Sequence, residues 1–396
     1  MPPTSLRPRP LKPRFVCRSC LSSRRQPFSS SSIPTSPPAP TPSGYAPLPS
    51  RRLISLSGPD AAKYLQGVIT ANIHGSDGHP RDRGFYTAFL NAQGRILHDV
   101  FVYPDGITAA GRGGQPGDSF LIEVDAGEAE RLQKHIKRYK LRAKFNVRLL
   151  DQGELSIWQA WDDAGKVELG DATVPGLLQL QDTRAPGLGY RLITAQGAAP
   201  TLELEPTSEA AYHVRRYLHG VPEGQEELER ERALPHESNM DIMGGVDFHK
   251  GCYVGQELTI RTQHRGVVRK RVLPCVLYAP ERPAPDHLTY RPAVESEEAG
   301  DIDAAMIPAD QSIGRVGKKG RSAGRWLRGV GNVGLALCRL EIMTDMVLPG
   351  EAPSASYNPA DEFIIEQKSE DGSVGQAVKV KAFVPDWLRR GLEQGR

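Results

Sequence analysis

The sequence predicts an α+β protein with two related lobes followed by a small β-barrel. Two observations lead to this fold class. A series of strand-like runs followed by a helical run occurs twice between residues 45 and 269, and after Lys270 the chain consists of short strand-like runs broken by glycine and proline. The length of 396 residues also suggests two or three domains, because single cores rarely grow beyond about 250 residues.

The first lobe, residues 45–151, is expected to combine hairpins with helices. Gly58-Pro59-Asp60 is a typical helix start, and the turn-forming residues 91–94 separate two apolar runs, which predicts a hairpin. The expected elements are strands at 52–56, 85–90, 96–103, 120–124 and 145–150 and helices that begin at Ala61 and span 127–139, the latter with Leu132, Ile136 and Tyr139 on one stripe.

The second lobe, residues 152–269, repeats this order, and the barrel occupies 270–396. The expected elements of the second lobe are strands at 155–161, 177–180 and 190–193 and a helix at 209–218 opened by Ser208. The barrel should end with a strand at 377–383, and the segments 280–310 and 317–332 are expected to be mobile insertions because they are rich in proline, acidic residues or glycine and arginine.

The N-terminal segment, residues 1–44, differs from the rest in composition. The first fifty residues hold thirteen prolines, eleven serines and seven lysines or arginines, and no acidic residue precedes Asp60. A basic, serine-rich segment without acids is typical of a mitochondrial presequence, so we expect a disordered leader and a location in the mitochondrial matrix; a tail without targeting function is the alternative. Without these residues the formal net charge falls from +3 to −4, so the charge balance gives no reason to expect a nucleic-acid partner.

Membrane insertion is not expected, since the sequence contains no run of eighteen apolar residues. Five cysteines do not suggest a disulfide framework. Cys17 and Cys20 lie in the predicted leader, and Cys275 and Cys338 lie in apolar, strand-like surroundings and are interpreted as core residues.

Cys252 is the cysteine whose neighbours suggest a function. It lies in Lys250-Gly251-Cys252-Tyr253-Val254-Gly255-Gln256-Glu257, where glycine precedes it, a lysine supplies positive charge, and Gly255-Gln256-Glu257 can open a helix with free backbone N–H groups. These features favour the thiolate, which is the form that attacks electrophiles and binds metal. An inert packing cysteine is the alternative.

This octapeptide resembles the K-G-C-Y-x-G-Q-E signature of the YgfZ family, of the folate-binding aminomethyltransferase (glycine-cleavage T-protein) superfamily. The eukaryotic branch of that family contains mitochondrial iron-sulfur cluster assembly factors of the Iba/Caf type. Other segments that resemble the family occur in the expected order at 56–61, 65–67, 70–72, 89–95, 182–184, 189–191 and 235–239. The resemblance implies an aminomethyltransferase-like fold, with the two lobes and the barrel arranged around a central pocket.

The resemblance also implies folate-binding candidates. Asp99 falls where aminomethyltransferases carry an Asp-Asp pair, but this chain reads His98-Asp99, so only one acid remains. Glu237 matches the glutamate that holds the pterin edge, which a carboxylate can do by accepting two N–H bonds. Arg191 could hold a folate carboxylate, although for Arg191 and Arg184 we expect bracing of the lobes through Asp182. A tetrahydrofolate-like ligand is therefore a possible cofactor.

Cys252 suggests iron-sulfur chemistry because a thiolate is a soft ligand for iron. One cysteine cannot supply the four ligands of a [2Fe-2S] or [4Fe-4S] cluster, so the cluster would be transient and shared with a partner. The resemblance implies that the partners are A-type iron-sulfur carriers, with ferredoxin as a possible electron donor.

Three functions are consistent with the sequence. The main hypothesis is a mitochondrial assembly factor for [4Fe-4S] proteins that acts through Cys252. The alternatives are a tetrahydrofolate-dependent one-carbon (aminomethyl) transferase or demethylase, and a scaffold without a ligand. The basic run 261–271 could bind the polyglutamate tail of a folate or an acidic partner, or could be a solvated helix end.

Overall fold

Five antiparallel strands form the sheet of the first lobe, in the order β3-β4-β5-β2-β6. These strands are β2 (Arg51–Ser57), β3 (Phe85–Leu90), β4 (Ile96–Pro104), β5 (Ser119–Asp125) and β6 (Asn146–Leu149). The computed structural model describes residues 36–75, 78–79, 81–107, 117–165, 167, 176–195, 198–292, 302–318, 320–347, 357–368 and 374–394. The predicted hairpin is confirmed, since β3 pairs with β4 around the turn at Asn91 to Gly94. β4 is buried over nearly all its length because both faces of the sheet are covered, so its residues do not alternate between buried and exposed, and even His98 and Asp99 are buried.

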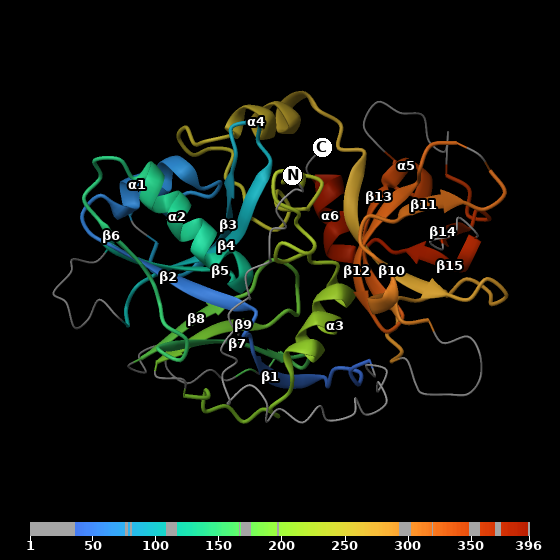
Figure 1. The fold of residues 1–396 in the computed structure, drawn as a ribbon, viewed down its shortest axis with the longest axis horizontal. Coiled ribbons are helices and arrows are strands. Elements are labelled where there is room, and N and C mark those ends of the chain that lie inside the picture. The colour runs from blue at the N-terminus through green and yellow to red at the C-terminus, as the bar shows by residue number, and fades with distance from the viewer. Residues whose placement is uncertain are drawn as a thin grey trace, which may run out of the picture. The chain divides into compact units, whose positions relative to one another are not determined.

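Two helices pack on one face of this sheet, α1 (Ala61–Val68) and α2 (Ala129–Tyr139), the second preceded by a 3₁₀ turn, η2 (Ala126–Glu128) (Figure 1). Leu65 of α1 and Leu132 and Ile136 of α2 join one core cluster with residues of β2 and β5. Tyr139 was predicted to lie on the same stripe as Leu132 and Ile136, and this prediction is wrong. It is the last residue of α2, is 52% exposed and packs on the ring of His135.

The second sheet has four antiparallel strands in the order β1-β7-β9-β8: β1 (Ser43–Pro47), β7 (Leu155–Asp162), β8 (Leu177–Gln181) and β9 (Tyr190–Ala195). β1 was not predicted. It begins at Ser43, inside the segment assigned to the leader, and it pairs with β7 rather than with the first sheet, so the boundary at residues 44 and 45 cuts through a strand. A five-residue strand whose partner lies more than a hundred residues away has no local signal.

The two sheets pack face to face through apolar side chains. Phe101 and Leu121 of the first sheet and Trp161 and Ile193 of the second belong to one buried cluster. α3 (Glu209–His219) follows the second sheet, and its Val214 packs with residues of the barrel. The predicted strand order and the helix after Ser208 are therefore present in the second lobe.

The C-terminal part is a closed six-stranded barrel in the order β10-β13-β12-β11-β14-β15, drawn in orange and red in Figure 1. Its strands are β10 (Lys270–Tyr278), β11 (Ser312–Arg315), β12 (Gly324–Val330), β13 (Val333–Arg339), β14 (Phe363–Lys368) and β15 (Val374–Ala382), with the helical turns η3 (Ala304–Met306) and α5 (Leu340–Met343). The prediction of a mobile insertion at 317–332 is wrong, because β12 lies there and buries Trp326 in the barrel core. Cys275 and Cys338 are core residues as predicted, with 3.9 Å between their sulfur atoms.

Helix α6 (Asp386–Gln394), which was not predicted, closes the chain against α3. The Trp387 indole N–H donates to the carbonyl oxygen of His219 at 3.0 Å, and Leu388 is fully buried. Within the described ranges, no helix combines the length and the apolar character needed to cross a bilayer.

Candidate functional site

Cys252 is exposed, and it lies on a loop that leads into helix α4 (Gln256–Arg265). This helix starts where Gly255-Gln256-Glu257 predicted a helix start. Figure 1 shows α4 beside the tip of the β3–β4 hairpin, far along the chain from it. The exposure that the flanking sequence predicted is therefore present, while a role of the thiol in ligating iron stays a prediction.

Two glycines fix α4 against the hairpin. Gly255 precedes the helix with φ of +83°, and a Cβ atom on it would lie 2.3 Å from the carbonyl oxygen of Asn91. Gly94, in the hairpin turn, has φ of +78°, and a Cβ there would lie 2.9 Å from the carbonyl oxygen of Gly255. Side chains at either position would force the two backbones apart. Gly251, by contrast, has open space around it, since a Cβ there would meet no atom within 4 Å beyond its chain neighbours.

Lys250 has a different role from the predicted one. Its ammonium group donates to three backbone carbonyls at the end of α1 and beyond, those of Gln66 at 2.8 Å, Ile69 at 2.7 Å and Ala71 at 2.9 Å. These bonds use all three ammonium protons. Burial lowers the pKa of Lys250 to about 8. Lys250 therefore ties the thiol loop to the first lobe.

The other motif residues fasten the loop on its C-terminal side. Tyr253 is 5% exposed, its hydroxyl lies 2.9 Å from that of Thr259, and its backbone N–H donates to the Gln256 side chain at 3.2 Å. The Val254 N–H donates to the carbonyl of Gly67 at 3.1 Å. Glu257 points to solvent from the first turn of α4. The result is an exposed thiol on a loop that is held from both sides.

The chemistry available at this loop is that of one exposed cysteine sulfur. Across the part of the chain that the structure describes, no three His, Cys, Asp or Glu side chains come together in a way that could hold a metal ion. An iron atom bound to Cys252 would therefore need its remaining ligands from outside the described residues.

The folate candidates Asp99 and Arg191 lie in the interface between the two sheets. Both are fully buried and belong to what we call the central ion network, which consists of Arg51, Arg184, Arg191, Arg216, Asp99, Glu123, Asp182, Glu223 and Glu227. Glu223 is its hub: the carboxylate accepts from Arg191 at 2.6 Å and from the Tyr212 hydroxyl at 2.9 Å and lies 2.7 Å from Arg184. Arg184 pairs with Asp182 at 2.7 Å as expected, whereas Arg191 reaches the first lobe through Glu123 at 3.5 Å rather than through Asp182.

The electrostatics of the network differ between its acids. Burial raises the pKa of Asp99, only partly opposed by the nearby Arg51 guanidinium, whose Nη1 lies 3.7 Å from the carboxylate. The pKa of Glu223 is held well below its usual range: burial alone would raise it, but Arg191, Arg184 and Arg51 outweigh that effect. Glu223 is therefore a buried carboxylate that depends on its arginines.

Asp99 and Arg191 are poorly placed for a pterin because protein groups already engage them. Asp99 Oδ1 accepts from the Gly224 N–H at 3.1 Å, and Arg191 is bound to Glu223 and lies 3.5 Å from Glu123. Glu123 and Glu223 were not singled out from the sequence. The available signal for Glu123 was its position inside the apolar run of β5, where a charged residue needs a buried partner.

Glu237 lies apart from that network, in a hollow of about 270 Å³ beside α4. Its carboxylate is 23% exposed and lies 3.4 Å from the Lys270 ammonium. Leu258, Arg269 and Arg339 also line this hollow. The structure thus separates Glu237 from Asp99 and Arg191, and of the three candidates only Glu237 is accessible to a ligand.

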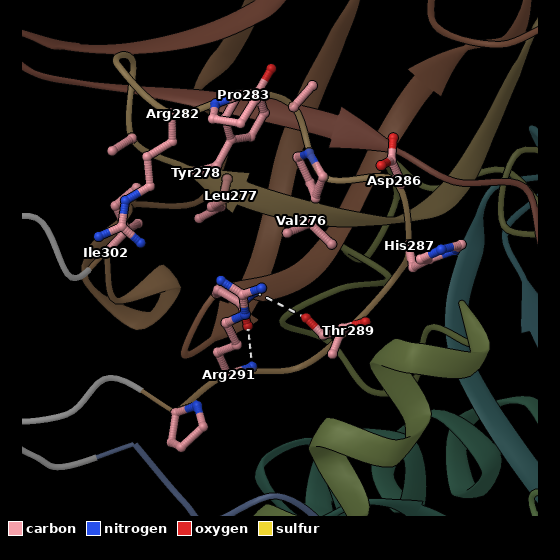
Figure 2. A pocket seen from close by; sticks show the side chains of 15 residues that line it. Val276, Leu277, Tyr278, Arg282, Pro283, Asp286, His287, Thr289, Arg291 and Ile302 are labelled. Carbon is pink, nitrogen blue, oxygen red and sulfur yellow. Dashed lines mark hydrogen bonds between the residues drawn. The ribbon is translucent and has the colours of Figure 1, made fainter.

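A larger hollow of about 410 Å³ lies at the end of β10, where Arg282, His287 and Arg291 surround a floor formed by Val276 and Leu277 (Figure 2). The side chain of Asn332 holds this loop in place by accepting from the Arg291 N–H at 2.6 Å and donating to the Thr289 carbonyl at 3.0 Å. None of the predicted site residues lines it.

Comparisons with known proteins agree with this architecture. The family described as "CAF17, C-terminal beta-barrel domain" matches residues 269–390. A crystal structure of the glycine cleavage system aminomethyltransferase T from Bartonella henselae is similar with a TM-score of 0.56 over 88% of this chain and 86% of that chain, at 14% identity, which supports the predicted aminomethyltransferase-like fold.

Curated relatives from several fungi carry the name "Iron-sulfur cluster assembly factor IBA57 homolog, mitochondrial". The protein from Pyricularia oryzae is 59% identical over 96% of this chain and 93% of its own length. The protein from Neurospora crassa is 50% identical over 95% of this chain and 88% of its own length. The chain belongs to the family of IBA57-type mitochondrial iron-sulfur cluster assembly factors.

Proposed function

We propose that this chain is a mitochondrial factor in the maturation of iron-sulfur proteins, and that Cys252 contributes one thiolate to a cluster shared briefly with an A-type iron-sulfur carrier. The observation that carries the proposal is the exposed thiol on a doubly fastened loop. The cluster is cargo in this reaction. The family supports the role in cluster assembly, and the carrier is the partner class that the sequence motif implies.

The electron balance requires a further partner. Joining two [2Fe-2S]²⁺ units to one [4Fe-4S]²⁺ cluster consumes two electrons, for which ferredoxin is the proposed donor. The mitochondrial matrix is the proposed compartment. It is supported by the basic, acid-free composition of residues 1–44 and by the mitochondrial names of the relatives.

One-carbon transfer is the weaker candidate. It requires an acid that can exchange a proton with a folate nitrogen, and Asp99 is fully buried against Gly224 and Arg51. A folate-type ligand, bound without turnover, is instead proposed to contact Glu237. Lys270, Arg269 and Arg339 line the same hollow and could pair with the ligand's carboxylates.

The folate proposal predicts that tetrahydrofolate binds and that Glu237→Gln weakens binding about tenfold, because a charge-assisted pair of hydrogen bonds is lost. Fluorescence titration measures this. Asp99→Asn serves as the comparison and should bind tetrahydrofolate like the unaltered chain. Equal affinities for the unaltered chain and Glu237→Gln, or the formation of methylene-tetrahydrofolate, would contradict the proposal.

The assembly proposal predicts that a purified A-type carrier and a [2Fe-2S] source form a coloured complex with this chain, and that Cys252→Ser forms none. The measurement is visible absorption and circular dichroism of the complex isolated by size exclusion. The variant should unfold at the same denaturant concentration as the unaltered chain, because an exposed side chain contributes little to stability.

The control for this experiment removes a different sulfur. Cys338→Ala, in the barrel core, should lower stability and leave the coloured complex intact. Both variants are made in a background with Cys17→Ser and Cys20→Ser. An unchanged complex in Cys252→Ser would refute the ligand role, and the absence of any complex in the unaltered chain would favour a scaffold without ligand.

A further inference from the structure

The surface around Cys252 continues onto the outer face of α4, and the inference drawn from it rests on the proposed function. α4 begins four residues after Cys252 and is about 15 Å long at 1.5 Å per residue. A standard protein interface covers about 800 Å² on each partner, which corresponds to a patch with a radius of roughly 16 Å. A protein that brings cluster ligands to the Cys252 sulfur therefore also covers much of this helix.

The outer face of α4 is basic. Glu257, Arg261 and Arg265 follow one another at four-residue spacing on that face, with His264 beside them, and all four are exposed. Thr259, on the opposite side, is buried. Two arginines against one glutamate leave a positive surface one to three turns from the thiol loop.

Two arginines of other helices, Arg131 and Arg216, offer a comparison with Arg261 and Arg265. Arg131 of α2 pairs with Glu128 at 2.9 Å, and Arg216 of α3 donates to Glu227 at 2.8 Å. Within the described residues, neither Arg261 nor Arg265 takes part in an ion pair or a side-chain hydrogen bond. Both guanidinium groups are thus available for a carboxylate of another protein, which they can bind in a bidentate manner.

Exposed apolar side chains stand at both ends of this basic face. Val254, two residues after Cys252, is 45% exposed, and Val267, just beyond the end of α4, is 40% exposed. Arginine is enriched in protein interfaces, and there apolar contact gives affinity while charge gives orientation and association rate.

We propose that Cys252, Val254, Val267 and the arginines Arg261 and Arg265 form one docking surface for a protein whose own cluster-ligating cysteines are surrounded by acidic residues. The charge on α4 selects and orients this acidic partner, and the thiol loop completes the cluster. Opposite charges accelerate the encounter and fix the register, so the effect of α4 falls mainly on the association rate.

The test is stopped-flow and equilibrium binding of the full chain to the cluster-loaded A-type carrier at several salt concentrations. Arg261→Glu/Arg265→Glu should weaken binding about tenfold or more at low salt, chiefly through slower association, and the difference should shrink as salt is raised. Arg261→Lys/Arg265→Lys should bind nearly as the unaltered chain does, since charge is kept.

The matched control is Arg282→Glu/Arg291→Glu, which makes the same change of charge at two exposed arginines of the loop after β10 (Figure 2). It should bind the carrier normally. If the α4 reversal and this control bind the carrier equally well, the docking surface is wrong, while the shared cluster at Cys252 stands. The docking surface is also wrong if the α4 reversal weakens only the binding of a polyglutamylated folate. A failure of the unaltered chain to bind the carrier would overturn the docking surface and the proposed function together.

Discussion

Glu223→Gln is expected to destabilise the protein by about 3–5 kcal/mol, because removing one partner of a buried ion cluster leaves the opposite charges uncompensated. Glu223 receives the Arg191 guanidinium and the Tyr212 hydroxyl and lies 2.7 Å from Arg184, and these side chains are fully or almost fully buried. In the variant, two arginines would remain in the interface between the sheets without sufficient negative charge. Guanidinium denaturation measures the change.

Glu226→Gln is the matched control, three residues further along the same segment. Its side chain is 68% exposed and pairs with Arg328 on the surface, so the loss should be within about 1 kcal/mol. If the two variants lose equal stability, the central ion network is not what holds the two sheets together.

The low pKa of Glu223 gives this prediction a pH dependence. A carboxylate whose pKa is lower in the folded chain than in the unfolded chain stabilises the fold above its unfolded pKa of about 4.5, and this stabilisation is lost as the pH falls through the folded pKa. The difference in unfolding free energy between the unaltered chain and Glu223→Gln should therefore shrink as the pH is lowered below about 4.5.

Gly255→Ala should cost about 2–4 kcal/mol and displace the thiol loop. Alanine would have to adopt φ of +83°, and its Cβ would meet the Asn91 carbonyl oxygen at 2.3 Å and the Leu90 Cβ at 3.0 Å. Since both contacts are with the β3–β4 hairpin, α4 must move away from it. Denaturant unfolding reports the stability, and faster hydrogen exchange at residues 250–258 reports the displacement.

Gly251→Ala is the companion variant. It lies four residues away in the same motif, but a Cβ there meets no atom within 4 Å. Its stability should change by less than about 0.5 kcal/mol. A large loss at Gly251, or none at Gly255, would show that the hairpin does not position α4.

The elements that local patterns specify were predictable. The hairpin turn at 91–94, the apolar spacing of α1 and the cap-like Ser208 before α3 are all local signals, and each led to an element close to its observed bounds. β1 and the central ion network depend on contacts between distant residues. Arg51 and Glu223 are separated by most of both lobes, and nothing near either residue predicts the other.

The candidate site was predictable in its position but not in its interactions. The glycines around Cys252 indicated an exposed thiol, and the sulfur is exposed. The charge of Lys250 was assigned to the thiol because the two residues are neighbours in sequence, whereas the three carbonyls that bind its ammonium group come from residues 66–71. A long flexible side chain reaches partners that sequence distance does not reveal.

The pairing of β1 with β7 sets an order of events for a chain that emerges from its N-terminus. Ser43 must wait for Asp162, so the backbone groups of β1 stay without their partner strand until more than a hundred further residues have left the ribosome or an import channel. A protease that cut after Pro47 would leave the backbone groups of β7 exposed, which invites aggregation. The position at which any leader is cleaved therefore matters for a sheet whose remaining strands all lie beyond residue 154.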